Sequence, residues 1–167
     1  MDLRERQAPL KEGYRERPED ARISLSARGS ETGEAVACSV DLGRLVQQAE
    51  AHGGVGGPGT GACSGDLLLG ALAACAQITC QMVAAATGIE TERIEAIAEG
   101  EIDLRGTLGI DREAPVGFES IRLRLEVEAP NATAEELEGL HARTERYCTV
   151  LQTLLEPPPI ETSLVAI

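Results

Sequence analysis

The chain's best candidates for chemistry are two of its five cysteines, Cys75 and Cys148. The thiolate rather than the thiol is the nucleophile, so a working cysteine needs a group that stabilises negative charge and a partner or reductant. Cys148 follows Arg143 and Arg146 and precedes residues 149–155, which could begin a new helical turn. Arginines and a helix N-terminus both favour the thiolate. Cys75 and Cys148 are therefore candidate catalytic residues.

Both thiols also have a packing interpretation. Cys75 lies mid-helix, and taken alone it is more often a small apolar core residue than a catalyst. The stripe that it shares at helical spacing consists of Leu68, Leu72, Ile78, Thr79 and Met82. Cys148 could extend the apolar face of the helix before it into the core. The residues alone leave both alternatives open.

The other three cysteines are weaker candidates. Cys38 falls on the apolar side of an expected strand and is expected to pack there. Cys63 lies in a glycine-rich loop before a long apolar helix, where backbone N–H groups could favour a thiolate. Cys80 is about 140° around the helix and about 7.5 Å along it from Cys75, too far for a disulfide within the helix. Any partner of Cys75 must come from elsewhere in the fold.

Composition argues against several classes of partner. The net charge is -13 and only three aromatic residues are present, one Phe and two Tyr. Nucleic acid and anionic membrane surfaces are therefore improbable partners. No CxxC pair occurs and His52 is far from His141 in sequence, so a metal site is not expected. The glycine-rich loop 57–62 fits a relaxed dinucleotide-binding string but lacks the strand and the acidic residue that such a site needs.

The cellular setting follows from the ends and the apolar stretch. Residues 1–20 are charged and carry no apolar stretch typical of a signal peptide, and the cysteines are odd in number. Both features favour the reducing cytoplasm. Residues 67–86 are uncharged over a spanning length, but three polar side chains interrupt them and basic anchors are lacking, so a helix buried in a soluble protein is preferred.

The expected elements place these residues in an α+β domain. Residues 1–20 are expected to form a mobile or loosely docked N-terminal arm, and residues 21–167 the domain. Alternating patterns predict a hairpin over residues 22–40 and two strands at 94–104 and 121–127. A helix is expected over 66–87, with Ser64 as its N-cap and Gly88 at its end, and a short helix is expected near 42–54. Thr133 and Glu136 predict a capping box for a helix that reaches Cys148, and residues 160–167 predict a last strand.

Two segments resemble the OsmC/Ohr superfamily, the osmotically induced and organic hydroperoxide resistance proteins. Residues 63–89, CSGDLLLGALAACAQITCQMVAAATGI, are similar to the family's long central helix, and the match puts its peroxidatic cysteine on Cys75. Residues 143–154, RTERYCTVLQTL, resemble its second motif and put the resolving cysteine on Cys148. The similarity in element order runs from about residue 20 to the end.

The resemblance implies an intertwined homodimer with antiparallel sheets packed around long central helices. The implied activity is a thiol-dependent peroxidase that reduces organic hydroperoxides: Cys75 becomes a sulfenic acid, Cys148 condenses with it, and an external dithiol reduces the disulfide. No metal, haem or flavin is implied. The alternative is a non-catalytic small-molecule-binding or redox-sensing member of the same fold.

The chain departs from the family pattern in two motifs. Many members have a glutamate just before the central helix, where this chain has Gly65, with Asp66 one step later. The second motif usually has proline after its cysteine, and this chain has Thr149. The activating arginine implied by the resemblance comes from the N-terminal hairpin, where Arg28 is the nearest candidate.

Overall fold

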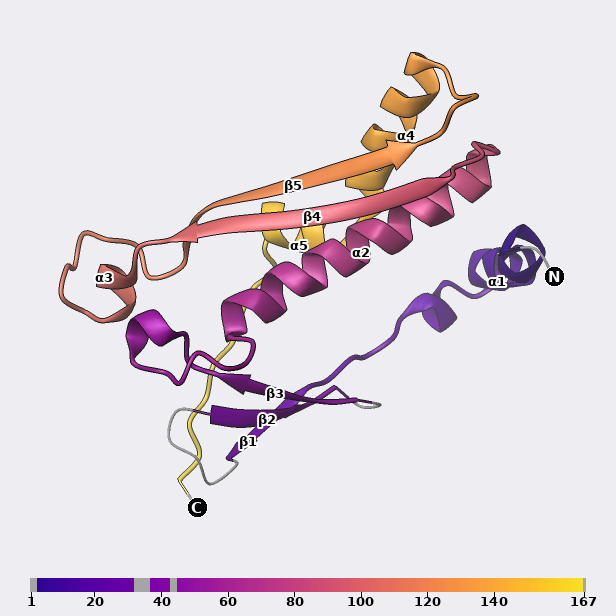
Figure 1. Cartoon of the computed structure of the whole chain (residues 1–167). Coiled ribbons are helices and arrows are strands. Elements are labelled where there is room, and N and C mark those ends of the chain that lie inside the picture. Colours follow the sequence, from indigo (N-terminus) through magenta and orange to yellow (C-terminus); the bar gives the residue numbers. More distant parts are fainter. Residues whose placement is uncertain (1–2, 32–36, 43–44, 167) are drawn as a thin grey trace. The chain divides into compact units, whose positions relative to one another are not determined.

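The structure is a computed structural model that describes residues 3–31, 37–42 and 45–166 (Figure 1). The chain forms two compact units. The first combines Met1–Gly70 with Ile97–Arg124, and the second combines Ala71–Ala96 with Leu125–Ile167. The described helices are α1 (Leu3–Glu16), α2 (Ser64–Thr87), α3 (Leu104–Thr107), α4 (Ala134–Tyr147) and α5 (Thr149–Leu155). The described strands are β1 (Arg28–Glu31), β2 (Ala37–Asp41), β3 (Val46–Glu50), β4 (Arg93–Ile102) and β5 (Phe118–Glu128).

The α+β class is confirmed, with two small sheets. One sheet has the order β1–β2–β3 with both pairs antiparallel, and the other pairs β4 with β5. Figure 1 shows β4 and β5 running in opposite directions. The two alternating segments expected as strands at 94–104 and 121–127 thus form β4 and β5, except that Leu104 already begins α3.

The N-terminal hairpin is present but begins later than predicted. Residues 22–27 form no strand, and Ile23 and Leu25 are 77% and 88% exposed, because the pairing partners of β2 are Arg28 to Glu31. The predicted short helix near 42–54 is wrong: Val46–Glu50 forms β3 instead. Pairing with β2, which brings Ala49 opposite Cys38, gives this segment hydrogen bonds that local helix propensity does not supply.

Helix α2 begins and ends through specific backbone bonds. Leu67 N–H donates to the Cys63 carbonyl (3.1 Å), so Cys63, not the predicted Ser64, is the N-cap. Gly88 ends the helix as predicted: its φ of 77° is left-handed, and Ile89 N–H reaches back to the Ala84 carbonyl (3.0 Å). This is the Schellman arrangement that glycine permits at little cost.

The second unit has its core between α2, α4 and the ends of β4 and β5 that belong to that unit. Its fully or nearly buried members are Cys80, Val83, Ala84 and Leu140, against which Ile89, Ile94, Leu125, Val127 and Leu137 pack. Gln77 Nε2 donates to the Ile94 carbonyl (2.8 Å) and ties α2 to β4. At about 1.5–3 kcal/mol for each fully buried aliphatic side chain, this cluster fixes the face that α2 turns inward.

Only one side of α2 is covered within the single chain. Leu72 and Thr79 are buried as expected, but Ile78 is 56% and Met82 41% exposed. Among the described residues of the isolated chain, the side of α2 that carries Ile78 and Met82 is thus left uncovered. By length and composition α2 is the one described helix that could cross a membrane.

The capping box before α4 is confirmed. Thr133 Oγ1 accepts from Glu136 N–H, and the Glu136 carboxylate accepts from Thr133 N–H (2.8 Å). Cys148 lies between α4 and α5 with extended dihedrals (φ -73°, ψ 103°), so it ends one helix and begins the next.

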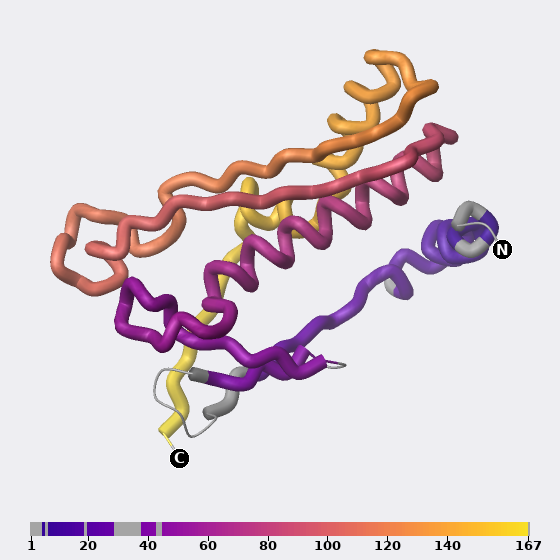
Figure 2. The backbone as a smooth tube through the Cα atoms, viewed as in Figure 1, coloured from indigo at the N-terminus to yellow at the C-terminus, as the bar shows by residue number. Residues whose placement is uncertain are grey.

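Apolar side chains near both ends of the chain are exposed. The segment expected as an N-terminal arm contains helix α1, whose Leu10 and Tyr14 are more than two-fifths exposed. The predicted last strand is wrong: residues 160–166 run as extended chain without helical turns or strand pairing (Figure 2). Ile160 and Leu164 are 81% and 96% exposed, so the apolar alternation there is not satisfied by burial within the described chain.

Candidate active site

The structure brings the Cys75 and Cys148 side chains into hydrogen-bonding contact. Cys75 comes from the middle of α2, and Cys148 from the single extended residue between α4 and α5. Both residues belong to the second unit, where the α2–α4 core holds their helices together. All five cysteines carry free thiols. Two thiols far apart in sequence thus form one reduced pair.

Hydrogen bonds around Cys75 favour its thiolate. Burial by itself raises the pKa of this thiol, but the hydrogen bonds outweigh burial, and the pKa of Cys75 is lowered overall. Four donors lower the pKa. In falling order of effect they are the backbone N–H of Val150, the thiol of Cys148, the hydroxyl of Thr79 and the backbone N–H of Thr149. Sequence reasoning placed Thr79 only on a packing stripe; its spacing of four residues from Cys75 was the signal for a contact.

The pKa of the partner thiol, Cys148, is raised instead. Burial raises the pKa of Cys148, and the negative charge of a Cys75 thiolate beside it raises that pKa further. Amide N–H groups of Leu151 and Val150 act in the other direction without reversing the result. Cys148 is 0% exposed, whereas Cys75 is partly exposed. The pair is therefore asymmetric: the reachable sulfur ionises, and the buried one stays protonated and donates to it.

Thr149 stands where the second motif of the family usually has proline, and this difference affects the hydrogen bonds to Cys75. Its backbone N–H is one of the donors that lower the pKa of Cys75. A proline at this position would have no N–H to give. The residue after the second cysteine therefore adds one donor to the thiolate in this chain.

The remaining cysteines have separate environments. Cys80 is fully buried, burial raises its pKa, and the bond with the Thr144 side chain only partly opposes this. Cys38 is half-buried on β2, in keeping with a packing role. Cys63 is the half-buried N-cap of α2, and its N–H donates to the Asp66 carboxylate (2.8 Å). This bond and one with the Cys63 side chain lower the pKa of Asp66.

The candidate activating arginine belongs to the other unit. Arg28 is exposed at the start of β1. Asp66, which follows the position of the family's glutamate, binds Cys63 as described. Among the described residues, no group of three or more His, Cys, Asp or Glu side chains could hold a metal ion.

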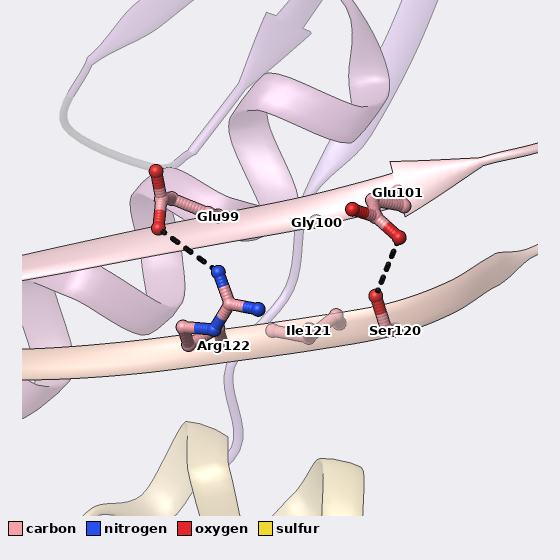
Figure 3. A pocket seen from close by; sticks show the side chains of 6 residues that line it. All are labelled: Glu99, Gly100, Glu101, Ser120, Ile121 and Arg122. Atoms are coloured by element: carbon pink, nitrogen blue, oxygen red, sulfur yellow. Dashed lines mark hydrogen bonds and ion pairs between the residues drawn. The ribbon is translucent and has the colours of Figure 1, made fainter.

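A hollow of about 400 Å³ lies on β4 and β5 in the first unit (Figure 3). Arg122 pairs with Glu99 across it (3.8 Å), and Ser120 donates to Glu101 (3.3 Å). These side chains are exposed and already paired, which is typical of a solvated sheet face.

The chain matches the family model described as OsmC-like protein over residues 57–163. This range covers more than half of the chain and includes both thiols. The chain belongs to the OsmC-like protein family. No curated protein matches it significantly in sequence.

Solved structures show the same OsmC-like fold. An OsmC-like protein from Mycoplasma pneumoniae is similar with a TM-score of 0.67 at 17% identity, covering 81% of this chain and 89% of that one. An organic hydroperoxide resistance protein OsmC from Legionella pneumophila has a TM-score of 0.61 at 17% identity, covering 80% and 90%. The organic hydroperoxide resistance protein OhrB of Bacillus subtilis has a TM-score of 0.52 at 18% identity, covering 81% and 93%.

Membership of the OsmC-like family confirms the resemblance drawn from residues 63–89 and 143–154. The matched range includes α2. Several similar structures are named for organic hydroperoxide resistance.

Proposed function

We propose that the protein is a thiol-dependent peroxidase that reduces organic hydroperoxides. The observation that supports this most is the asymmetric thiol pair, in which the pKa of Cys75 is lowered and that of Cys148 is raised. Catalysis of this kind needs a thiolate that the substrate can reach and a second thiol held beside it. Cys75 is the partly exposed member and Cys148 the buried one.

In the first step, the Cys75 thiolate attacks the distal oxygen of the hydroperoxide. The O–O bond breaks, the sulfur is oxidised to a sulfenic acid, and the departing alkoxide takes a proton to become an alcohol. In the second step, the Cys148 sulfur attacks the Cys75 sulfenic acid, and water leaves as the disulfide forms. An external dithiol then reduces the disulfide by exchange and is itself oxidised. Neither step needs a metal, haem or flavin.

The surroundings of Cys75 support an organic substrate. On an ideal helix, Ala71, Ile78 and Met82 lie within about 60° of Cys75 around the axis of α2. Ile78 and Met82 are largely uncovered in the single chain. An apolar surface beside the thiolate favours the alkyl part of an organic hydroperoxide over hydrogen peroxide, which has nothing to bury.

The same apolar face supports a homodimer as part of the proposal. Exposed Ile78 and Met82 leave the outer face of α2 without a cover, and soluble proteins rarely leave a large apolar patch uncovered. A second copy of the chain would bury this face against its own and enclose the substrate near Cys75. We place the enzyme in the reducing cytoplasm, where a thiol pair can be regenerated.

The test is turnover of an organic hydroperoxide with a dithiol supplied. Wild-type protein should consume many equivalents of peroxide, and Cys75→Ser should consume none. Without dithiol, Cys148→Ser should form the Cys75 sulfenic acid once and then stop, because its resolving thiol is missing. Full turnover by Cys75→Ser would overturn the assignment.

A redox sensor would use the same pair without turnover. Mass spectrometry after one equivalent of hydroperoxide should show a Cys75–Cys148 disulfide for an enzyme and for a sensor alike. Repeated consumption with excess dithiol separates the two, since only an enzyme continues. A non-catalytic ligand-binding protein would show neither the disulfide nor consumption.

A further inference from the structure

The junction at Cys148 leaves backbone groups without helical partners. Helix ends carry unpaired N–H and carbonyl groups, and only one residue separates α4 from α5. Cys148 N–H donates to the Thr144 carbonyl (2.9 Å), which completes the last turn of α4. No side chain caps the N-terminus of α5. The first N–H groups of α5 are therefore free for the two sulfurs, and Thr149 and Val150 donate to Cys75.

Gln152 ties α5 to α4 at this junction. Its side-chain Nε2 donates to the Glu145 carbonyl (2.9 Å), one of the last carbonyls of α4. Its own backbone N–H donates to the Cys148 carbonyl (2.9 Å). Both the side chain and the backbone of Gln152 thus hold the first turn of α5 in place. Gln152 is half-buried, and its side-chain bond to Glu145 lies at the exposed surface.

Helix α5 depends on such a tie because it is short. It has seven residues, whereas isolated helices below about 12–15 residues are marginal in water. The direction of its first N–H groups is therefore set by its attachment to α4, and α4 is fixed against α2 through Leu140 and Cys80. Gln152 provides a side-chain hydrogen bond between α5 and α4.

We propose that Gln152 is a positioning residue that holds the N–H groups of Thr149 and Val150 against the Cys75 sulfur. It touches neither the sulfur nor the substrate, and it acts through the angle of α5. The consequence for catalysis rests on the proposed peroxidase function, but the positioning itself does not. The proposal extends the peroxidase function by assigning part of the stabilisation of the Cys75 thiolate to Gln152, a side chain of α5 that follows Cys148 in the sequence.

The test measures the thiolate of Cys75 directly in full-length reduced protein. Gln152→Met keeps the length and helix propensity of the side chain and removes its donor. The rate of Cys75 alkylation by iodoacetamide is followed against pH, with peptide mass spectrometry to separate Cys75 from the other four cysteines. Far-ultraviolet circular dichroism and a thermal melt verify that each variant is folded.

In Gln152→Met the midpoint of the pH dependence of Cys75 alkylation should move to higher pH. Below the midpoint the thiolate fraction should fall about threefold, since the donors are loosened and not removed. Thr153→Val is the matched control: it removes a hydroxyl that bonds the Thr149 carbonyl within α5 (2.8 Å) and leaves the tie to α4 intact. Its midpoint should stay at the wild-type value. Gln152→Asn, whose amide is one methylene too short to reach Glu145, should repeat the shift and serves if the Met variant does not fold.

A wild-type midpoint in folded Gln152→Met would overturn the proposal. An equal shift in Thr153→Val would do the same, because it would mean that any weakening of α5 has this effect. Failure of the peroxidase assay in wild-type protein is a separate result. It would remove the proposed function while leaving the dependence of the Cys75 midpoint on Gln152 as measured.

Discussion

Replacement of Thr79 by valine should weaken the Cys75 thiolate while leaving the helix in place. Valine has nearly the same shape as threonine, so the change removes only the hydroxyl that donates to Cys75. Thr79 is 9% exposed, so water cannot readily take over this bond. A hydrogen bond to a charged group contributes about 1.5–3 kcal/mol, and the lower end applies here because three other donors remain. The thiolate fraction below the midpoint should fall about tenfold, since about 1.4 kcal/mol corresponds to a factor of ten.

The assay is the pH dependence of Cys75 alkylation, read at the peptide that contains Cys75, together with the rate of reaction with an organic hydroperoxide at neutral pH. Both should fall in Thr79→Val and recover in Thr79→Ser, which restores a hydroxyl. Thr87→Val is the control on the same helix, where the hydroxyl bonds the Val83 carbonyl (2.8 Å). An unchanged Cys75 midpoint in Thr79→Val would refute the reasoning. It would mean that the hydroxyl proton goes to the backbone carbonyl four residues earlier, a bond that threonine often makes in helices.

Three further outcomes are expected. Leu140→Ala should lower the free energy of unfolding by about 2–5 kcal/mol in urea titrations, because this 1% exposed side chain packs in the α2–α4 core; a loss below about 1 kcal/mol would contradict that packing. Ile78→Asp should shift the protein toward the monomer in sedimentation measurements, whereas the same distribution as wild type would exclude the outer face of α2 from the proposed dimer. Folding lowers the pKa of Cys75, so the unfolded state binds more protons at this residue. The free energy of unfolding of wild type should therefore rise relative to that of Cys75→Ala as pH rises through the lowered pKa, and level off above the usual thiol value of 9.0. A difference that stays flat or shrinks across this window would contradict the lowered pKa.

Local patterns in the sequence were enough to predict the elements with strong local signals. The alternation at 121–127 gave β5, and Thr133 with Glu136 gave the start of α4, because both signals lie within a few residues of each other. Gly88 marked the end of α2 because the left-handed conformation there favours glycine. The two candidate thiols were identified in the same way, from the elements around them.

Features that depend on distant partners were missed. Val46–Glu50 is a strand because β2 lies beside it, and no periodicity within those five residues reveals that pairing. The alternation in residues 160–166 has no strand to pair with in the described chain, so a correct local pattern led to a wrong prediction. The contact of Cys75 with Cys148 was likewise an implication of the family resemblance, and only the packing of α2 against α4 supplies the physical cause.

Two of the donors to Cys75 are main-chain amides, and this affects how the region can change over evolutionary time. Every amino acid other than proline carries the N–H that Thr149 and Val150 provide, so mutation at these positions can alter polarity, size and charge without deleting a donor. Relatives that make the same two backbone hydrogen bonds to the cysteine need not have the same residue types at either position. Alignments that score side chains would then rank the two positions as variable, although each contributes an atom to the reacting sulfur's environment.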